Sequence, residues 1–216
     1  MTSSLPVYLY VPNLLCYARI VLAFYGMHLS YDQPVRAVFI FVLSAILDLF
    51  DGILARALDQ TSSFGVLLDV FADNILRTCG WFAAACHPEA SSILRMVAVT
   101  VVCLEWITMV STQLHAAHAQ QHWKAERSND PWLVRALYAN GFKNPIGALA
   151  MYGLFGANLW TYGTFFSELY GTIPYYAVFQ YLSYFGRALG CCVEVSMIKG
   201  YLSLVVEQDS KAKSSD

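Results

Sequence analysis

Four aspartates stand at helical spacing within one apolar stretch of the sequence. Asp48 and Asp51 are three residues apart and Asp69 and Asp73 are four apart, so each pair lies on one face of a helix. A charge at the centre of a bilayer costs at least about 2.5–3.5 kcal/mol, so four such carboxylates need cations or a water-filled cavity. Hard divalent cations choose oxygen ligands and commonly join carboxylates to phosphates. The spacing therefore predicts a divalent metal site for a phosphate-bearing substrate.

The residues between the two acid pairs support a phosphate ligand. Gly52 follows Asp51 directly and lets a ligand approach the backbone closely. Small Ala55 keeps that approach open, and Arg56 offers a planar, permanently charged partner for phosphate oxygens. Ser62 adds a hydroxyl from the connecting loop, and Gly65 opens the next predicted helix.

The elements that position these residues are predicted to be membrane helices. The chain has 216 residues, of which 57% are hydrophobic and only 13% are charged, with a mean hydropathy of +0.49. A helix needs about 20 mostly apolar residues to cross a bilayer. We predict an all-α, six-helix membrane bundle that forms a single domain over residues 1–216. The six segments are Val11–Leu29, Val35–Arg56, Gly65–Cys86, Ser92–His115, Pro145–Phe166 and Tyr175–Val205.

The distribution of Lys and Arg predicts the orientation. Basic residues gather at one set of predicted loops and helix ends, which the positive-inside rule assigns to the cytosol. The acid pairs and both termini are expected on that side. The cytosolic loop of about residues 116–144 is polar, with an interfacial helix near Trp132, and the tail of about 208–216 is predicted to be disordered. We expect no removable signal peptide, and the formal charge of −2 gives no reason to expect nucleic acid.

The full pattern resembles a known signature. Read in order, the fixed positions are Asp48-x2-Asp51-Gly52-x2-Ala55-Arg56-x8-Gly65-x3-Asp69-x3-Asp73. This is similar to the signature of the CDP-alcohol phosphotransferases, a family of membrane enzymes with six-helix cores. The predicted second and third helices carry it here, as they do in that family.

The resemblance implies roles for these residues. Asp48, Asp51, Asp69 and Asp73 would hold two divalent ions, Mg²⁺ or Mn²⁺, and Asp73 would also accept the proton of the attacking alcohol. We assign the CDP-linked donor to a site at Gly52, Ala55, Arg56, Ser62 and Gly65. The implied reaction is attack of an alcohol on the lipid-side phosphorus, with CMP as the leaving group.

Two further stretches, VPNLLCYARIVLAF and DLFDGILARALDQ, look like eukaryotic phosphatidylinositol synthases. That likeness implies CDP-diacylglycerol as donor, myo-inositol as acceptor, the endoplasmic reticulum membrane and a homodimer. The chain departs from those synthases at Asn74, where they carry Arg, at Glu105, where we expect Asp, and in lacking a Ser-His-Lys segment in the long loop.

Three arginines are candidates for contacts with the acceptor or a phosphate: Arg19, Arg77 and Arg187. Arg19 could instead pair with an acid, and Arg187 with Glu105 or Glu194. The alternatives for function are the same chemistry with glycerol 3-phosphate or serine, a CDP-choline or CDP-ethanolamine donor, and a non-catalytic cation transporter or binding protein, because intramembrane acids also mark ion pathways.

Overall fold

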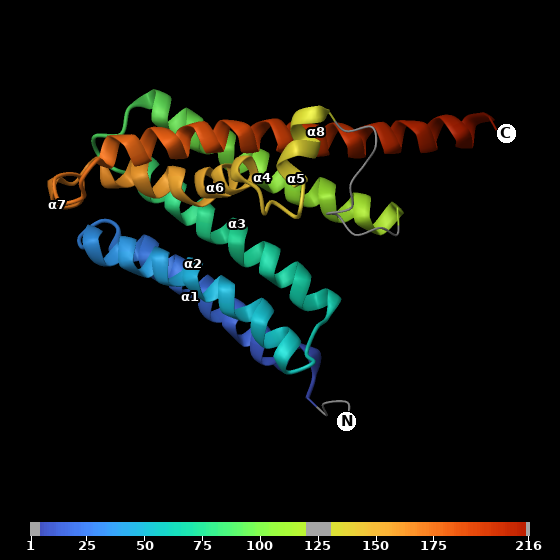
Figure 1. The fold of residues 1–216 in the computed structure, drawn as a ribbon, viewed down its shortest axis with the longest axis horizontal. Coiled ribbons are helices and arrows are strands. Elements are labelled where there is room, and N and C mark those ends of the chain that lie inside the picture. The colour runs from blue at the N-terminus through green and yellow to red at the C-terminus, as the bar shows by residue number, and fades with distance from the viewer. Residues whose placement is uncertain (1–4, 120–130, 215–216) are drawn as a thin grey trace. The chain divides into compact units, whose positions relative to one another are not determined.

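The fold is helical throughout the part of the chain that the structure, a computed structural model, describes, namely residues 5–119 and 131–214 (Figure 1). Six long helices coincide with the six predicted segments. They are α1 (Val11–Leu29), α2 (Pro34–Ala57), α3 (Ser63–Ala85), α4 (Ser92–Ala119), α6 (Pro145–Gly163) and α8 (Tyr176–Ser214). Three short helical segments, η1 (Val7–Leu9), α5 (Trp132–Tyr138) and α7 (Ser167–Tyr170), complete the described elements.

The starts of the long helices follow from local chemistry. Pro12 and Pro34 lie in the first turns of α1 and α2, and Pro145 begins α6. Proline is favoured there because the first helical amides have no intrahelical partner. Ser62 caps α3 by accepting a hydrogen bond from the amide of Gly65 at 3.0 Å.

Among the described residues, three helices are long and apolar enough to cross a membrane. They are residues Pro34–Ala57, Ser92–Ala116 and Tyr176–Lys211. The third predicted span forms α3 but carries Asp69, Asp73 and Arg77, and polar residues also interrupt α1 and α6. Long helices therefore overlap the predicted segments in the described residues, whereas a six-helix membrane bundle stays a prediction.

The described residues form two compact units, and the single domain expected from the sequence stays a prediction. Unit 1 comprises Met1–Val99 and Asn158–Tyr176, and unit 2 comprises Thr100–Ala157 and Ala177–Asp216.

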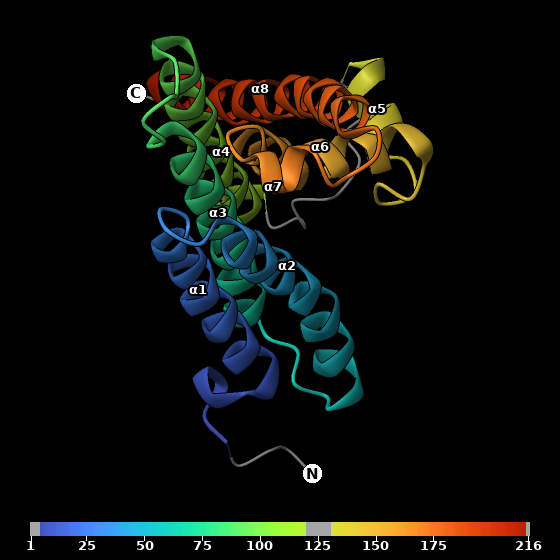
Figure 2. The same cartoon turned by 90° about the vertical axis from the view of Figure 1, so that its left-hand side faces the viewer.

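In unit 1, α1 packs against both α2 and α3, and those two helices contact each other much less (Figure 2). The end of α6 is tied to α3, because the Asn158 amide donates to the carbonyl of Arg77 at 3.1 Å. Tyr162 likewise donates to the carbonyl of Ser30 at 2.6 Å.

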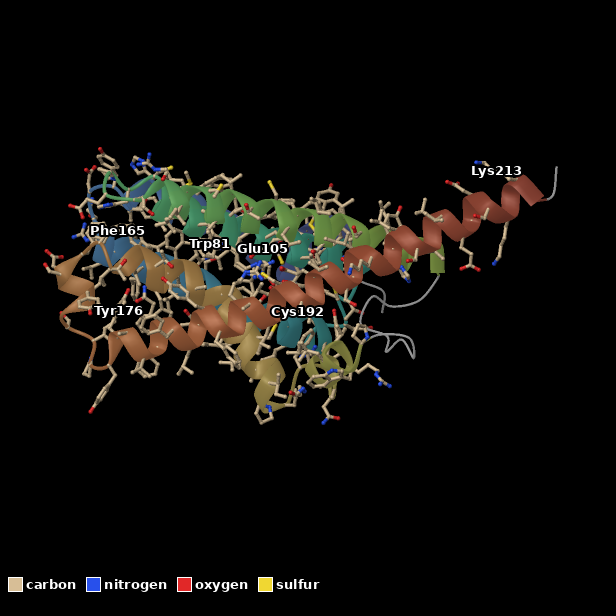
Figure 3. The ribbon with its side chains drawn as sticks, turned by 90° about the horizontal axis from the view of Figure 1, so that it is seen from above. Trp81, Glu105, Phe165, Tyr176, Cys192 and Lys213 are labelled. Atoms are coloured by element: carbon tan, nitrogen blue, oxygen red, sulfur yellow. The ribbon has the colours of Figure 1, made fainter. Side chains whose placement is uncertain are left out.

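Unit 2 is held by close packing of α6 on α8 and by a buried cation. Gly153 and Gly186 bring the two backbones together: a Cβ added to Gly186 would collide with the carbonyl of Leu149. Glu105 of α4 faces α8, as Figure 3 shows, and its Oε1 lies 3.2 Å from Arg187 Nη2.

Gly186→Ala is expected to lower the free energy of unfolding by about 1–3 kcal/mol, because the added methyl forces the two backbones apart. Gly190→Ala is the matched control on the same helix, since a methyl there meets no backbone atom of another helix and its nearest neighbour is a side-chain atom, Arg187 Nη1, at 3.2 Å. Thermal unfolding in detergent measures both. Equal midpoints for the two variants would contradict this account of the α6–α8 packing.

Two expectations about the polar segments change in detail. The helix predicted near Trp132 exists as α5, but Leu137 is fully buried and packs with Ala150 and Val193. Residues 208–214, predicted to be disordered, form the last turns of α8, and Lys213 stands at its far end (Figure 3). The pair Glu207–Lys211, 2.7 Å apart at helical spacing, supports those turns. The centre of the predicted loop, 120–130, lies outside the described residues.

Candidate active site

The four aspartates of the signature gather around one side chain, the guanidinium of Arg19. Its Nη1 lies 2.7 Å from Asp51 Oδ2 and 2.8 Å from Asp69 Oδ1. Its Nη2 lies 2.8 Å from Asp48 Oδ1 and also pairs with Asp73 Oδ1. The predicted convergence of the two acid pairs is therefore present in unit 1, and the possible pairing of Arg19 with an acid is realised with all four.

Local structure explains why the acids face the same centre. Asp48 and Asp51 lie almost one turn apart near the end of α2, and Asp69 and Asp73 lie about one turn apart early in α3. Arg19 reaches them from the middle of α1. The Arg19 side chain is fully buried, whereas the side chain of Asp69 is 41% exposed. The cluster is thus closed on the α1 side and open at Asp69.

The donor atoms suit hard divalent ions. Among the described residues, two groups of side chains have ligand atoms within 4.8 Å of one another. One group is Asp48, Asp69 and Asp73, and the other is Cys16, Asp51 and Asp69. Asp69 belongs to both groups, and four of the five residues in them carry carboxylates. Carboxylate oxygen is the ligand preferred by Mg²⁺ and Mn²⁺, so the residues present fit the ions that the signature implies.

A cavity of about 180 Å³ adjoins the acid cluster. Its lining includes all five residues assigned to the donor site: Gly52, Ala55, Arg56, Ser62 and Gly65. Asp51 and Asp69 also line it, so the cavity and the metal ligands are continuous. Arg56 is exposed, and its Nη1 would lie 3.5 Å from a Cβ placed on Gly52. A phosphate group at Gly52 would therefore meet both the carboxylate cluster and a guanidinium.

The loop between α2 and α3 is fixed to the start of α1. The backbone amide of Val11 donates to Gln60 Oε1 at 2.8 Å. Asp59, at the turn, has a φ of 52°, in the left-handed region. Asp59 is exposed, so it is a solvated acid of this loop.

The other two candidate arginines lie in different surroundings. Arg77 is buried below the acid cluster, with Nη1 3.8 Å from Asp73 Oδ2 and a hydrogen bond from Nη2 to Asn74 Oδ1. Arg187 belongs to unit 2. There its guanidinium pairs with both Glu105 and Glu194, so both suggested partners are realised.

Sequence reasoning missed part of the cavity wall. Asn13 and Cys16 line it from α1, and Gln60 lines it from the loop. Cys16 has its Sγ 3.7 Å from Asp51 Oδ2. Residues 13, 16 and 19 recur every three positions on an otherwise apolar helix. That spacing was the available signal, because it puts Asn13, Cys16 and Arg19 on one polar face.

Comparison with known proteins identifies relatives of this chain. Residues 9–184 match the sequence model described as CDP-alcohol phosphatidyltransferase. The CDP-diacylglycerol–inositol 3-phosphatidyltransferase of Schizosaccharomyces pombe is 29% identical over 135 residues, covering 62% of this chain and 56% of that protein. The proteins of the same name from Rattus norvegicus and Homo sapiens are each 32% identical over 135 residues, covering 62% of both partners. No solved structure matches this chain.

The relatives and the family model match different lengths of this chain. The chain spans about 56–62% of the length of the relatives named above. The family match is broader than those alignments on this chain, since it runs from η1 into α8 and includes every residue of the signature. The chain therefore belongs to the CDP-alcohol phosphatidyltransferase family.

Proposed function

We propose that the chain transfers the phosphatidyl group of CDP-diacylglycerol to myo-inositol, giving phosphatidylinositol and CMP. The observation that carries the proposal is the convergence of Asp48, Asp51, Asp69 and Asp73 beside a cavity lined by Gly52 and Arg56. The choice of donor and alcohol is supported by the names of the relatives, which specify CDP-diacylglycerol and inositol.

Gly52 and Arg56 bind the donor, and Asp73 accepts a proton. Gly52 admits the diphosphate close to the backbone of α2, and the exposed Arg56 guanidinium binds its oxygens. Asp73 accepts the proton of the attacking hydroxyl while the hydroxyl oxygen forms a bond to the lipid-side phosphorus. The bond from that phosphorus to the CMP oxygen breaks, so one phosphodiester forms as the anhydride is cleaved.

The four aspartates would hold two divalent ions, Mg²⁺ or Mn²⁺. When bound, such ions neutralise the diphosphate and stabilise the charge on the departing CMP. The carboxylates alone repel a diphosphate, and Arg19 and Arg77 offset only two of their four charges. Substrate binding at this site therefore needs further positive charge.

The setting of the reaction completes the proposal. The chain is an integral membrane protein, as its three long apolar helices and its family indicate. We propose six crossings, with the active site and both termini in the cytosol, in the endoplasmic reticulum membrane. A homodimer stays a prediction of the family resemblance.

The test is a panel of alcohols given to the purified protein with CDP-diacylglycerol and Mg²⁺, with released CMP as the readout. We expect release with myo-inositol and none with serine, glycerol 3-phosphate or no alcohol. Release with glycerol 3-phosphate or serine instead would overturn the inositol assignment and keep the transferase chemistry. Release with no alcohol would identify a hydrolase.

A further inference from the structure

Arg19 joins the two acid-bearing helices in a regular way. Each terminal nitrogen of its guanidinium contacts one aspartate of α2 and one of α3. Nη1 bridges Asp51 to Asp69, with distances of 2.7 and 2.8 Å. Nη2 bridges Asp48 to Asp73, with 2.8 Å to Asp48 Oδ1. The planar fork of arginine thus makes two parallel links between the helices.

The packing of unit 1 makes these links important. α2 and α3 contact each other little, and α1 contacts both of them extensively (Figure 2). The α1 backbone is itself fixed beside α2, because Ser44, fully buried, donates from Oγ to the carbonyl of Arg19 at 3.1 Å. The distance between the two acid pairs is therefore set through α1, and Arg19 is the side chain of α1 that touches all four acids.

One oxygen of each carboxylate makes the close contact with Arg19. These are Asp48 Oδ1, Asp51 Oδ2, Asp69 Oδ1 and Asp73 Oδ1. Each carboxylate has a second oxygen that can face another ligand; that of Asp73 lies 3.8 Å from Arg77 Nη1. A buried cation that binds one edge of a carboxylate orients its other edge, as outer-shell partners do for metal ligands.

We propose that Arg19 is the positioning residue of the metal site. Each terminal nitrogen of Arg19 holds one aspartate of α2 close to one aspartate of α3. The other oxygens of the four carboxylates are thereby placed together as one set of metal ligands. This assigns Arg19 to the metal site and not to an acceptor or lipid phosphate. The inference rests on the proposed function, because it takes the four aspartates as metal ligands.

The role depends on the fork as well as on the charge. A lysine ammonium is a single point charge on a flexible stem and cannot place two nitrogens between two acid pairs. Arg19→Lys therefore keeps the positive charge and removes the double link. Arg19→Met removes both and leaves the acids without a compensating cation, which destabilises a buried cluster.

The test measures the binding of Mn²⁺ alone to the purified full chain. The electron paramagnetic resonance signal of free Mn²⁺ is the readout. Arg19→Lys is expected to raise the dissociation constant by about 10- to 100-fold. Arg187→Lys is the matched control: Arg187 is also buried and paired with two acids, but it lies in unit 2. It should keep the Mn²⁺ affinity of wild type. Arg19→Met should bind no more tightly than Arg19→Lys.

The outcomes separate the inference from the proposed function. If Arg19→Lys binds Mn²⁺ as tightly as wild type, or more tightly, the positioning role is overturned while the transferase proposal stands. If Arg19→Lys fails to reach a monodisperse folded state while Arg187→Lys folds, Arg19 is a structural residue and the inference is also overturned. If wild type releases CMP without taking up Mn²⁺ or Mg²⁺, the metal site itself is refuted.

Discussion

Asp73→Asn protein is expected to release CMP from CDP-diacylglycerol and inositol about 10²–10⁴-fold more slowly than wild type. The amide cannot accept the proton of the alcohol, and it replaces a charged oxygen ligand with a neutral group. Asparagine has nearly the size of aspartate, so the helix should stay folded. The initial rate of CMP release at saturating substrate is the measurement.

Asp59→Asn is the matched control for this substitution. Asp59 is an exposed acid of the α2–α3 loop at a φ of 52°, a conformation that asparagine also adopts readily. Its rate should equal that of wild type. Turnover by Asp73→Asn at the wild-type rate would remove Asp73 from the reaction, and an equal loss in both variants would point to general damage near the site.

Removal of divalent ions is expected to reduce CMP release to the background rate. Four carboxylates and the guanidinium groups of Arg19 and Arg77 carry a net charge of −2 (−4 + 2), which repels the diphosphate of the donor. Mg²⁺ or Mn²⁺ added in excess of EDTA should restore the rate. Ca²⁺ should restore less, because it takes more ligands in a looser geometry.

EDTA already saturated with Mg²⁺ is the control for direct effects of the chelator. It should leave the rate unchanged. Full turnover of the metal-stripped protein would show that protein groups alone carry the charge, and the assignment of the four aspartates to metal would then be wrong.

The sequence predicts the helices of this protein well because their determinants are local. The bounds of α1 match the predicted Val11–Leu29, and α2 begins at Pro34, within one residue of the prediction. Proline in the first turn and the Ser62 cap are signals within a few residues of the helix starts. The helical spacing of Asp48 with Asp51 likewise needs no tertiary information.

The arrangement around Arg19 could not be predicted in the same way. Its partners stand 32, 50 and 54 residues further along the chain for Asp51, Asp69 and Asp73. A single arginine in a membrane helix is compatible with a lipid phosphate, a substrate or an acid. Only the packing of α1 against both other helices selects the acids.

The polar composition of the tail also led to a prediction that differs from the structure. Residues 208–214 are polar and suggest disorder, yet a helix can continue outward on pairs such as Glu207–Lys211. Cys16 shows the opposite case, since it lies in a mostly apolar helix and yet its side chain lines the cavity. In both cases, the surroundings of the helix determine the structure at these residues, and composition alone does not show those surroundings.

The most direct test of the account is a balance of products from purified wild-type protein in lipid vesicles with Mg²⁺, CDP-diacylglycerol and labelled inositol. The account predicts one phosphatidylinositol for each CMP, with the label in the lipid. Release of CMP from CDP-diacylglycerol without labelled lipid would contradict this reaction. The absence of CMP release from protein that binds the ions would also contradict it.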